Sequence, residues 1–115
     1  MSARAVPLYE AGGSLVCARC EVADSAPVRM RGLLGRNALP EDGGMLFTRT
    51  GSIHTFFMRF PIDVVFCDRD MRVLKVVRGL GPWRTAWTRR AKVVVELPAG
   101  TAAVEPGDRL LLGES

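Results

Sequence analysis

Long apolar runs are absent from this 115-residue chain, and cysteine and histidine are scarce. No stretch approaches the roughly 20 apolar residues that a membrane-spanning helix needs. The first 13 residues also lack the apolar core of a signal peptide. Three cysteines, an odd and small number, favour free thiols in a reducing compartment over a disulfide framework. These absences predict a cytoplasmic protein without membrane insertion.

Lysine is scarce as well, so arginine supplies most of the positive charge behind the net charge of +4. The planar guanidinium suits phosphate and carboxylate groups, but heavy arginine use also follows from genome base composition. Charge alone therefore decides nothing about partners. With 48% hydrophobic and 24% charged residues, the chain is typical of one soluble domain that is long enough to bury a core.

Short segments rich in Val, Leu, Ile and Phe, bounded by Gly, Pro or Asp, predict strands. They cover Leu15–Val22, Met45–Thr48, Ile62–Cys67, Val73–Val77, Val93–Leu97 and Leu110–Leu112, and His54–Met58 is a further candidate. Residues 68–71 and 105–108 predict turns. The fold predicted is mainly β: a single-domain β-sandwich of six to eight short strands with one short helix. A parallel α/β fold is not predicted, because it would need a helix after each strand and the sequence offers too few.

The one predicted helix covers residues 25–35, where Ser25 is suited to cap its start and Gly35 to end it. Residues 1–13 are expected to form a flexible N-terminal arm, and residues 14–115 the single domain.

The only histidine, an arginine and an aspartate lie within one largely apolar stretch, HTFFMRFPIDVVFCD, at residues 54–68. Side chains alternate on extended segments, and Pro61 predicts a bend between two such segments. Asp63 is costly to bury without a donor, and Arg59 is the candidate partner. Such an ion pair can be purely structural. If His54 joins the other two in one pocket, the imidazole and guanidinium face a small anion.

Two further motifs have a functional and a structural interpretation. Cys17 and Cys20 are spaced like half of a zinc or redox site, but positions i and i+3 of a regular strand point to opposite faces, so no metal site is predicted. Residues 83–92 interleave two tryptophans with three arginines and a lysine, as a platform for single-stranded nucleic acid does. The same composition suits a solvated loop, and no other nucleic-acid motif accompanies it, so nucleic acid is the less favoured partner.

The chain resembles the family known as domain of unknown function 192 in the order and spacing of its motifs. They are RGLLGR at 31–36, GMLF at 44–47, IHTF at 53–56, MRFPIDVVF at 58–66, PW at 82–83, VELPAG at 95–100 and PGD at 106–108. The resemblance implies a compact, jelly-roll-like β-sandwich with a short helix packed on it. It implies no reaction or ligand. Phe57 departs from the glycine expected beside His54 in the shorter branch of the family, which predicts a smaller pocket there.

The leading hypothesis is a non-catalytic binding module for a small polar or anionic ligand or a protein partner, with a groove around His54, Arg59, Asp63 and Arg36. One alternative is a hydrolase or isomerase in which His54 is the general base, Asp63 orients it and Arg59 holds an anionic substrate. A second alternative is single-stranded nucleic acid binding through residues 83–92. No metal or organic cofactor is predicted.

Overall fold

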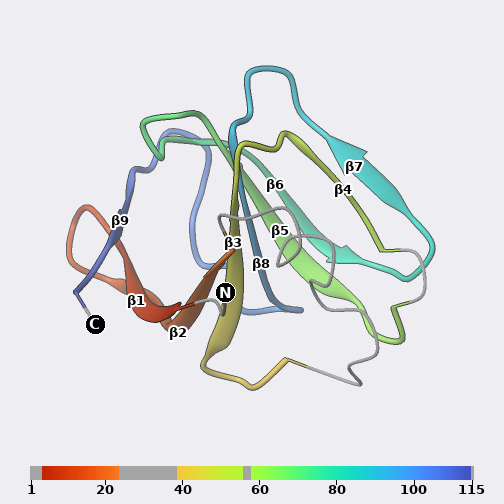
Figure 1. Cartoon of the computed structure of the whole chain (residues 1–115), viewed down its shortest axis with the longest axis horizontal. Helices are drawn as coiled ribbons and strands as arrows, with labels where there is room; N and C mark the ends of the chain where they lie inside the picture. Colours follow the sequence, from red (N-terminus) through yellow and green to blue (C-terminus); the bar gives the residue numbers. More distant parts are fainter. Residues whose placement is uncertain (1–3, 24–38, 56–57, 115) are drawn as a thin grey trace.

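The computed structural model describes residues 4–23, 39–55 and 58–114, and within these ranges the chain forms nine strands (Figure 1). The strands are β1 (Arg4–Glu10), β2 (Leu15–Ala23), β3 (Gly43–Thr48), β4 (Ser52–His54), β5 (Ile62–Cys67), β6 (Val73–Leu80), β7 (Thr85–Trp87), β8 (Val93–Pro98) and β9 (Leu110–Leu112). The mainly β class is confirmed, and all six predicted strands are present. The helix predicted over residues 25–35 lies outside the described residues.

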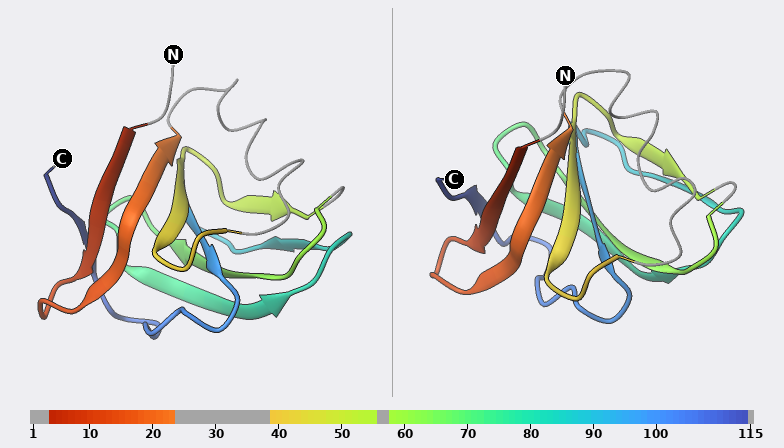
Figure 2. Two further views of the ribbon diagram at one scale, coloured as in Figure 1. Left: turned by 90° about the horizontal axis from the view of Figure 1, so that it is seen from below. Right: turned by 60° about the horizontal axis from the view of Figure 1, so that its bottom comes forward.

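Seven strands form one sheet in the order β6-β5-β8-β3-β2-β1-β9, and β4 and β7 form a separate two-stranded ribbon. Among the nine strands of the described ranges, only β2 and β3 pair in parallel. The large sheet is strongly curled (Figure 2). The Val73 amide donates to the Asp108 carbonyl at 2.7 Å, and the Leu110 amide donates to the Met71 carbonyl at 2.9 Å. The C-terminal segment therefore connects the β6 side of the sheet with β9 and β1.

The predicted flexible arm is instead largely a strand, because residues 4–10 form β1 between β2 and β9. Val6 and Leu8 are 3% and 0% exposed, so β1 contributes to the core. Pro7 lies at an irregularity in the pairing with β2, where its missing N–H costs least. Its carbonyl accepts the Gly113 amide at 2.7 Å. The partners of β1 thus include residues at the far end of the chain.

Two hydrophobic cores lie on the two faces of the large sheet, and β5 contributes to both. Ile62, Val64 and Phe66 belong to the ribbon-side core, against which β4 and β7 pack, while Val65 and Cys67 belong to the opposite core. This division confirms the alternation predicted for the strand. The ribbon-side core also contains Ala23, Leu39, Met45, Phe47, Met58, Ala91 and Val94. The opposite core also contains Val6, Leu8, Cys17, Cys20, Val22, Leu46, Val73, Val93, Val95, Leu97, Ala102, Val104 and Leu110.

Both predicted turns are present. The Met71 amide donates to the Asp68 carbonyl at 3.0 Å, and the Asp108 amide donates to the Glu105 carbonyl at 3.1 Å. The Asp68 carboxylate also accepts the Asp70 amide at 2.9 Å and so stabilises its own turn. The first of these turns places Arg69 at the end of the sheet where the candidate site lies.

Candidate functional site

Asp63 is wholly buried on β5 and is bound by backbone N–H groups. Its Oδ1 accepts the Gly79 amide at 2.8 Å, and its Oδ2 accepts the Gly100 and Ala102 amides at 3.0 Å each. Gly79 and Gly100 have φ values of 67° and 85°, the left-handed region that favours glycine. Three backbone amides thus supply donors of the kind that the sequence analysis expected from Arg59. Through these hydrogen bonds, Asp63 joins β5 to β6 and to the turn after β8.

His54 lies on a different layer of the molecule. It ends β4, and because its neighbour Ile53 packs against the ribbon-side core, His54 faces outward and is exposed. Asp63 alternates with the ribbon-side residues of β5 and therefore faces the opposite core. The large sheet separates the imidazole from the carboxylate. Arg59 is exposed in the segment before β5, and Arg36 lies outside the described residues.

Thr55 explains why β4 ends at His54 instead of continuing to Met58. The side chain of Thr55 is wholly buried, its Oγ1 donates to the Gly81 carbonyl at 2.6 Å, and the same oxygen accepts the Arg84 amide at 2.8 Å. The Thr55 carbonyl accepts the Met58 amide at 3.1 Å, which turns the chain. Thr55 therefore fixes the loop that leads into β7, and with it the position of the ribbon.

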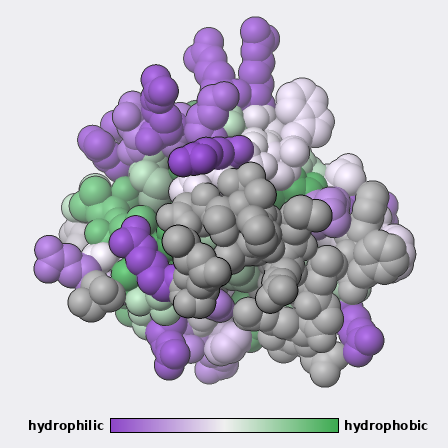
Figure 3. All heavy atoms as spheres, in the orientation of Figure 1, coloured by the Kyte–Doolittle hydropathy of each residue, from purple (hydrophilic) through white to green (hydrophobic). Residues whose placement is uncertain are grey.

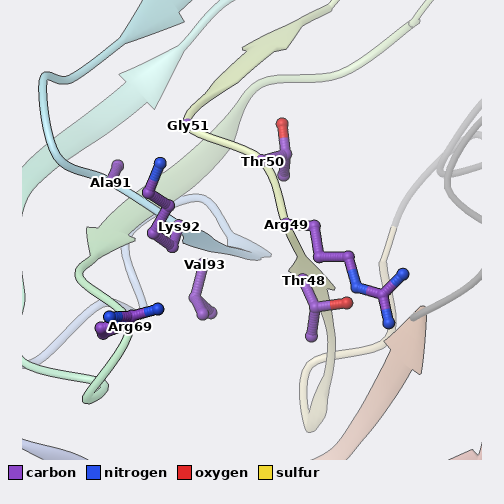
Figure 4. Close-up of a pocket in the computed structure, with 8 residues that line it drawn as sticks. All are labelled: Thr48, Arg49, Thr50, Gly51, Arg69, Ala91, Lys92 and Val93. Carbon is purple, nitrogen blue, oxygen red and sulfur yellow. The ribbon is translucent and has the colours of Figure 1, made fainter.

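An open pocket of about 500 Å³ lies where three loops meet at one end of the large sheet (Figure 4). It is lined by residues 48–51, 69 and 91–93. The Thr50 amide donates to the Lys92 carbonyl at 3.1 Å, and the Lys92 amide donates to the Cys67 carbonyl at 2.8 Å. A Cβ added to Gly51 would lie 2.7 Å from the Ala91 carbonyl oxygen. The backbone of the pocket is therefore closely packed.

The three loops around this pocket are rich in positive charge. Their exposed cationic residues are Arg49, Arg69, Arg89, Arg90 and Lys92. Asp68 and Asp70 are the acidic residues of loops 48–51, 68–71 and 88–92. Figure 3 shows hydrophilic side chains gathered along the upper edge of the molecule, where Figure 1 places these loops. In Figure 4, Arg69 and Lys92 lie on one side of the pocket and Arg49 on the other, with its guanidinium turned outward.

The sequence does not reveal this cationic pocket, because each of its loops contributes only part of it. Arg49 follows β3, Arg69 lies in the turn after β5, and Lys92 precedes β8. Nothing in their spacing along the chain indicates that they meet. The only signal was the basic segment 83–92, whose last residues do line the pocket.

Glu96 is a second buried carboxyl group, and it was not predicted from the sequence as a candidate site residue. It lies on β8 between Met45 of β3 and Val64 of β5, and is 5% exposed. Burial raises the pKa of Glu96 to about 7. A single carboxyl within the apolar run VVVELP was the available signal. Because Val95 and Leu97 face the opposite core, Glu96 faces the ribbon side of the sheet.

Cys17 and Cys20 share one face of β2, contrary to the expectation for a regular strand. Val6 pairs with Cys20 and Leu8 with Cys17, so β2 has one extra residue between them, and this bulge brings both thiols into the opposite core. A hydrogen bond with Cys20 lowers the pKa of Cys17, and the same bond raises that of Cys20. In the described part of the chain, no group of three or more His, Cys, Asp or Glu side chains is placed to hold a metal ion.

Comparison with known proteins identifies the family. The family model of domain of unknown function 192 (DUF192, "Uncharacterized ACR") matches residues 8–112, and the chain belongs to this family. A UPF0127 protein of Pyrococcus abyssi is 35% identical over 102 residues, which cover 80% of this chain and 84% of that protein. A UPF0127 protein of Pyrococcus furiosus is 43% identical over 63 residues, which cover 51% of this chain and 53% of that protein. The match thus spans about half the length of the latter relative.

Two solved structures share the fold. A Sinorhizobium meliloti protein called a "putative transcription regulator" has a TM-score of 0.81 and 29% identity, with 96% of this chain and 94% of that chain covered. A Novosphingobium aromaticivorans protein of unknown function has a TM-score of 0.77 and 23% identity, with 95% of this chain and 84% of that chain covered. Across residues 4–23, 39–55 and 58–114, no helix has the length and apolar character needed to cross a membrane.

Proposed function

We propose that this protein is a non-catalytic binding module whose ligand carries a phosphate or another compact anionic group. The ligand is held in the pocket between loops 48–51, 68–71 and 88–92. The observation that carries the proposal is that three exposed cationic residues, Arg49, Arg69 and Lys92, line one pocket whose described lining contains no acidic residue. Guanidinium and ammonium groups donate charge-assisted hydrogen bonds to oxyanions. The proposed ligand class is the anionic one expected from the sequence, at a different place.

Two observations favour binding over catalysis. His54, the only histidine, lies on the outer face of the ribbon, and Asp63, the group expected to orient it, lies across the large sheet. The pocket itself offers guanidinium and ammonium groups, which bind an oxyanion without acting as an acid–base pair at neutral pH. The Sinorhizobium meliloti neighbour is called a "putative transcription regulator", and such a role is compatible with an anionic ligand.

The test is a titration of the ¹⁵N-labelled chain with inorganic pyrophosphate, followed by NMR. We expect shifts in the amides of the three loops. Replacing Arg69 and Lys92 together by Ser should weaken binding at least tenfold, because two surface cations contribute together about 1.4 kcal/mol. Arg19→Ser is the matched control, since Arg19 is exposed and pairs with Gly43 at the other end of β3. Equal affinity of the double variant and the control would overturn the proposal.

A further inference from the structure

The outer face of the ribbon presents flat rings beside the cationic pocket. Ser52 pairs with Trp87 and His54 pairs with Thr85, while the alternate residues of both strands pack inward. Trp87 is 67% exposed, which is unusual for the largest apolar side chain. The indole and the imidazole therefore lie on one solvent-facing surface, diagonally opposed across the two strands.

This surface adjoins the pocket along the chain. Gly51 lines the pocket and directly precedes Ser52, the cross-strand partner of Trp87. The Thr88 amide donates to the Gly51 carbonyl at 3.1 Å, so the residue after Trp87 is bonded to the pocket wall. The basic turn with Arg89 and Arg90 follows at once. An elongated ligand thus meets cations and an exposed indole within a few residues of one another.

We propose that the ligand of this site is a single-stranded nucleic acid, whose phosphates bind at the cationic pocket and whose bases stack on Trp87. The proposal rests on the proposed anion-binding function and names its ligand class. Stacking on an aromatic ring beside a positively charged groove is the arrangement by which single strands are bound without sequence readout. His54 offers a second ring for the neighbouring base.

Other polyanions fit these observations less well. A duplex keeps its base faces stacked inside the helix, so an exposed indole gains nothing from it. An anionic membrane surface favours a contiguous apolar face that inserts between lipids. The neighbours of Trp87 on the ribbon are instead the polar residues Ser52, His54 and Thr85. An exposed indole in polar surroundings therefore favours unpaired bases.

The experiment measures fluorescence anisotropy with the complete chain and a labelled ten-nucleotide oligothymidylate. An abasic ten-unit phosphodiester of the same charge is the reference ligand, because it offers phosphates without bases. We expect the oligothymidylate to bind at least tenfold more tightly than the abasic strand. Log affinity should fall with log salt with a slope of about −2 to −3.5, corresponding to three to five phosphate contacts.

Two sets of variants separate base stacking from phosphate binding. Trp87→Ala should reduce the affinity for oligothymidylate most of the way to that for the abasic strand, and should leave pyrophosphate binding unchanged. Tyr9→Ala, which removes a partly exposed ring on β1, is the control and should change neither the oligothymidylate nor the pyrophosphate affinity. The double variant Arg69→Ser, Lys92→Ser should weaken the binding of oligothymidylate, the abasic strand and pyrophosphate alike.

Each contrary outcome points to a different error. Equal affinities for oligothymidylate and the abasic strand, unaffected by Trp87→Ala, would overturn the nucleic-acid assignment and leave the anion site standing. Preference for a duplex of the same length, or binding to anionic phosphatidylserine vesicles without oligonucleotide binding, would overturn it as well. If the double variant of Arg69 and Lys92 bound all three ligands as tightly as wild type, both the anion site and the nucleic-acid assignment would be rejected.

Discussion

Replacing Asp63 by Asn should destabilise the fold strongly although it removes only a charge. The wild-type carboxylate accepts three backbone amides at 2.8 to 3.0 Å and is wholly buried. Asn keeps one acceptor oxygen and directs an NH₂ group at backbone donors. Hydrogen bonds to charged groups contribute about 1.5–3 kcal/mol each, and an unpaired buried donor costs about 1–3 kcal/mol. We therefore expect the free energy of unfolding to fall by about 3–5 kcal/mol.

The assay is urea denaturation followed by tryptophan fluorescence or circular dichroism, with a lower midpoint and an unchanged slope as the expected result. Asp70→Asn is the control, because Asp70 is exposed in the turn after β5, and it should stay within about 0.5 kcal/mol of wild type. A loss below about 1 kcal/mol for Asp63→Asn, combined with weaker anion binding, would refute the structural role. It would return Asp63 to the ligand site expected from the sequence.

Three further predictions concern Glu96, the pocket backbone and the ribbon. Because burial raises the pKa of Glu96 from 4.5 to about 7, the folded state binds the proton of the Glu96 carboxyl group more tightly than the unfolded state does. Stability should therefore fall by about 3 kcal/mol between pH 4.5 and pH 8, and Glu96→Gln should abolish that fall; a pH profile unchanged by Glu96→Gln would contradict this. Gly51→Ala places a Cβ 2.7 Å from the Ala91 carbonyl oxygen, so thermal unfolding should show a loss of about 1–3 kcal/mol, whereas Gly81→Ala, with no atom within 4 Å, should be neutral. Thr55→Val leaves the part-buried Arg84 amide and Gly81 carbonyl without their side-chain partner, and amide hydrogen exchange in loop 81–84 should accelerate roughly tenfold or more; unchanged exchange would argue against the role of Thr55 in fixing this loop.

Local sequence patterns predicted the strands that are apolar along their own length. The β5 and β9 bounds agree residue for residue, because branched residues there are flanked by turn residues. Strands β1 and β7 were missed for physical reasons, and β4 (Ser52–His54) shares only His54 with the candidate strand His54–Met58. Residues 4–10 contain Pro7, which argues against a strand inside a sheet, and pairing with β2 and β9 holds them in place. Residues 85–87 form a three-residue strand with exposed ends inside a basic segment, so their composition resembles a loop.

The candidate site was harder to predict because its parts are distant in the sequence. The donors to Asp63 lie 16, 37 and 39 residues away, so an aspartate in an apolar strand looked like the partner of its neighbour Arg59. Each of three loops likewise contributes one cationic side chain to the pocket lining, and the order of strands in the sheet brings these loops together. Sequence spacing is informative about a site when its residues share one element, and here they do not.

The most direct test of the proposed function is a crystal structure of the complete chain with pyrophosphate. The account predicts electron density for the ligand between loops 48–51, 68–71 and 88–92, within hydrogen-bond distance of Arg69 or Lys92. Density only at another surface, or an empty pocket at a concentration where the NMR titration is saturated, would contradict it.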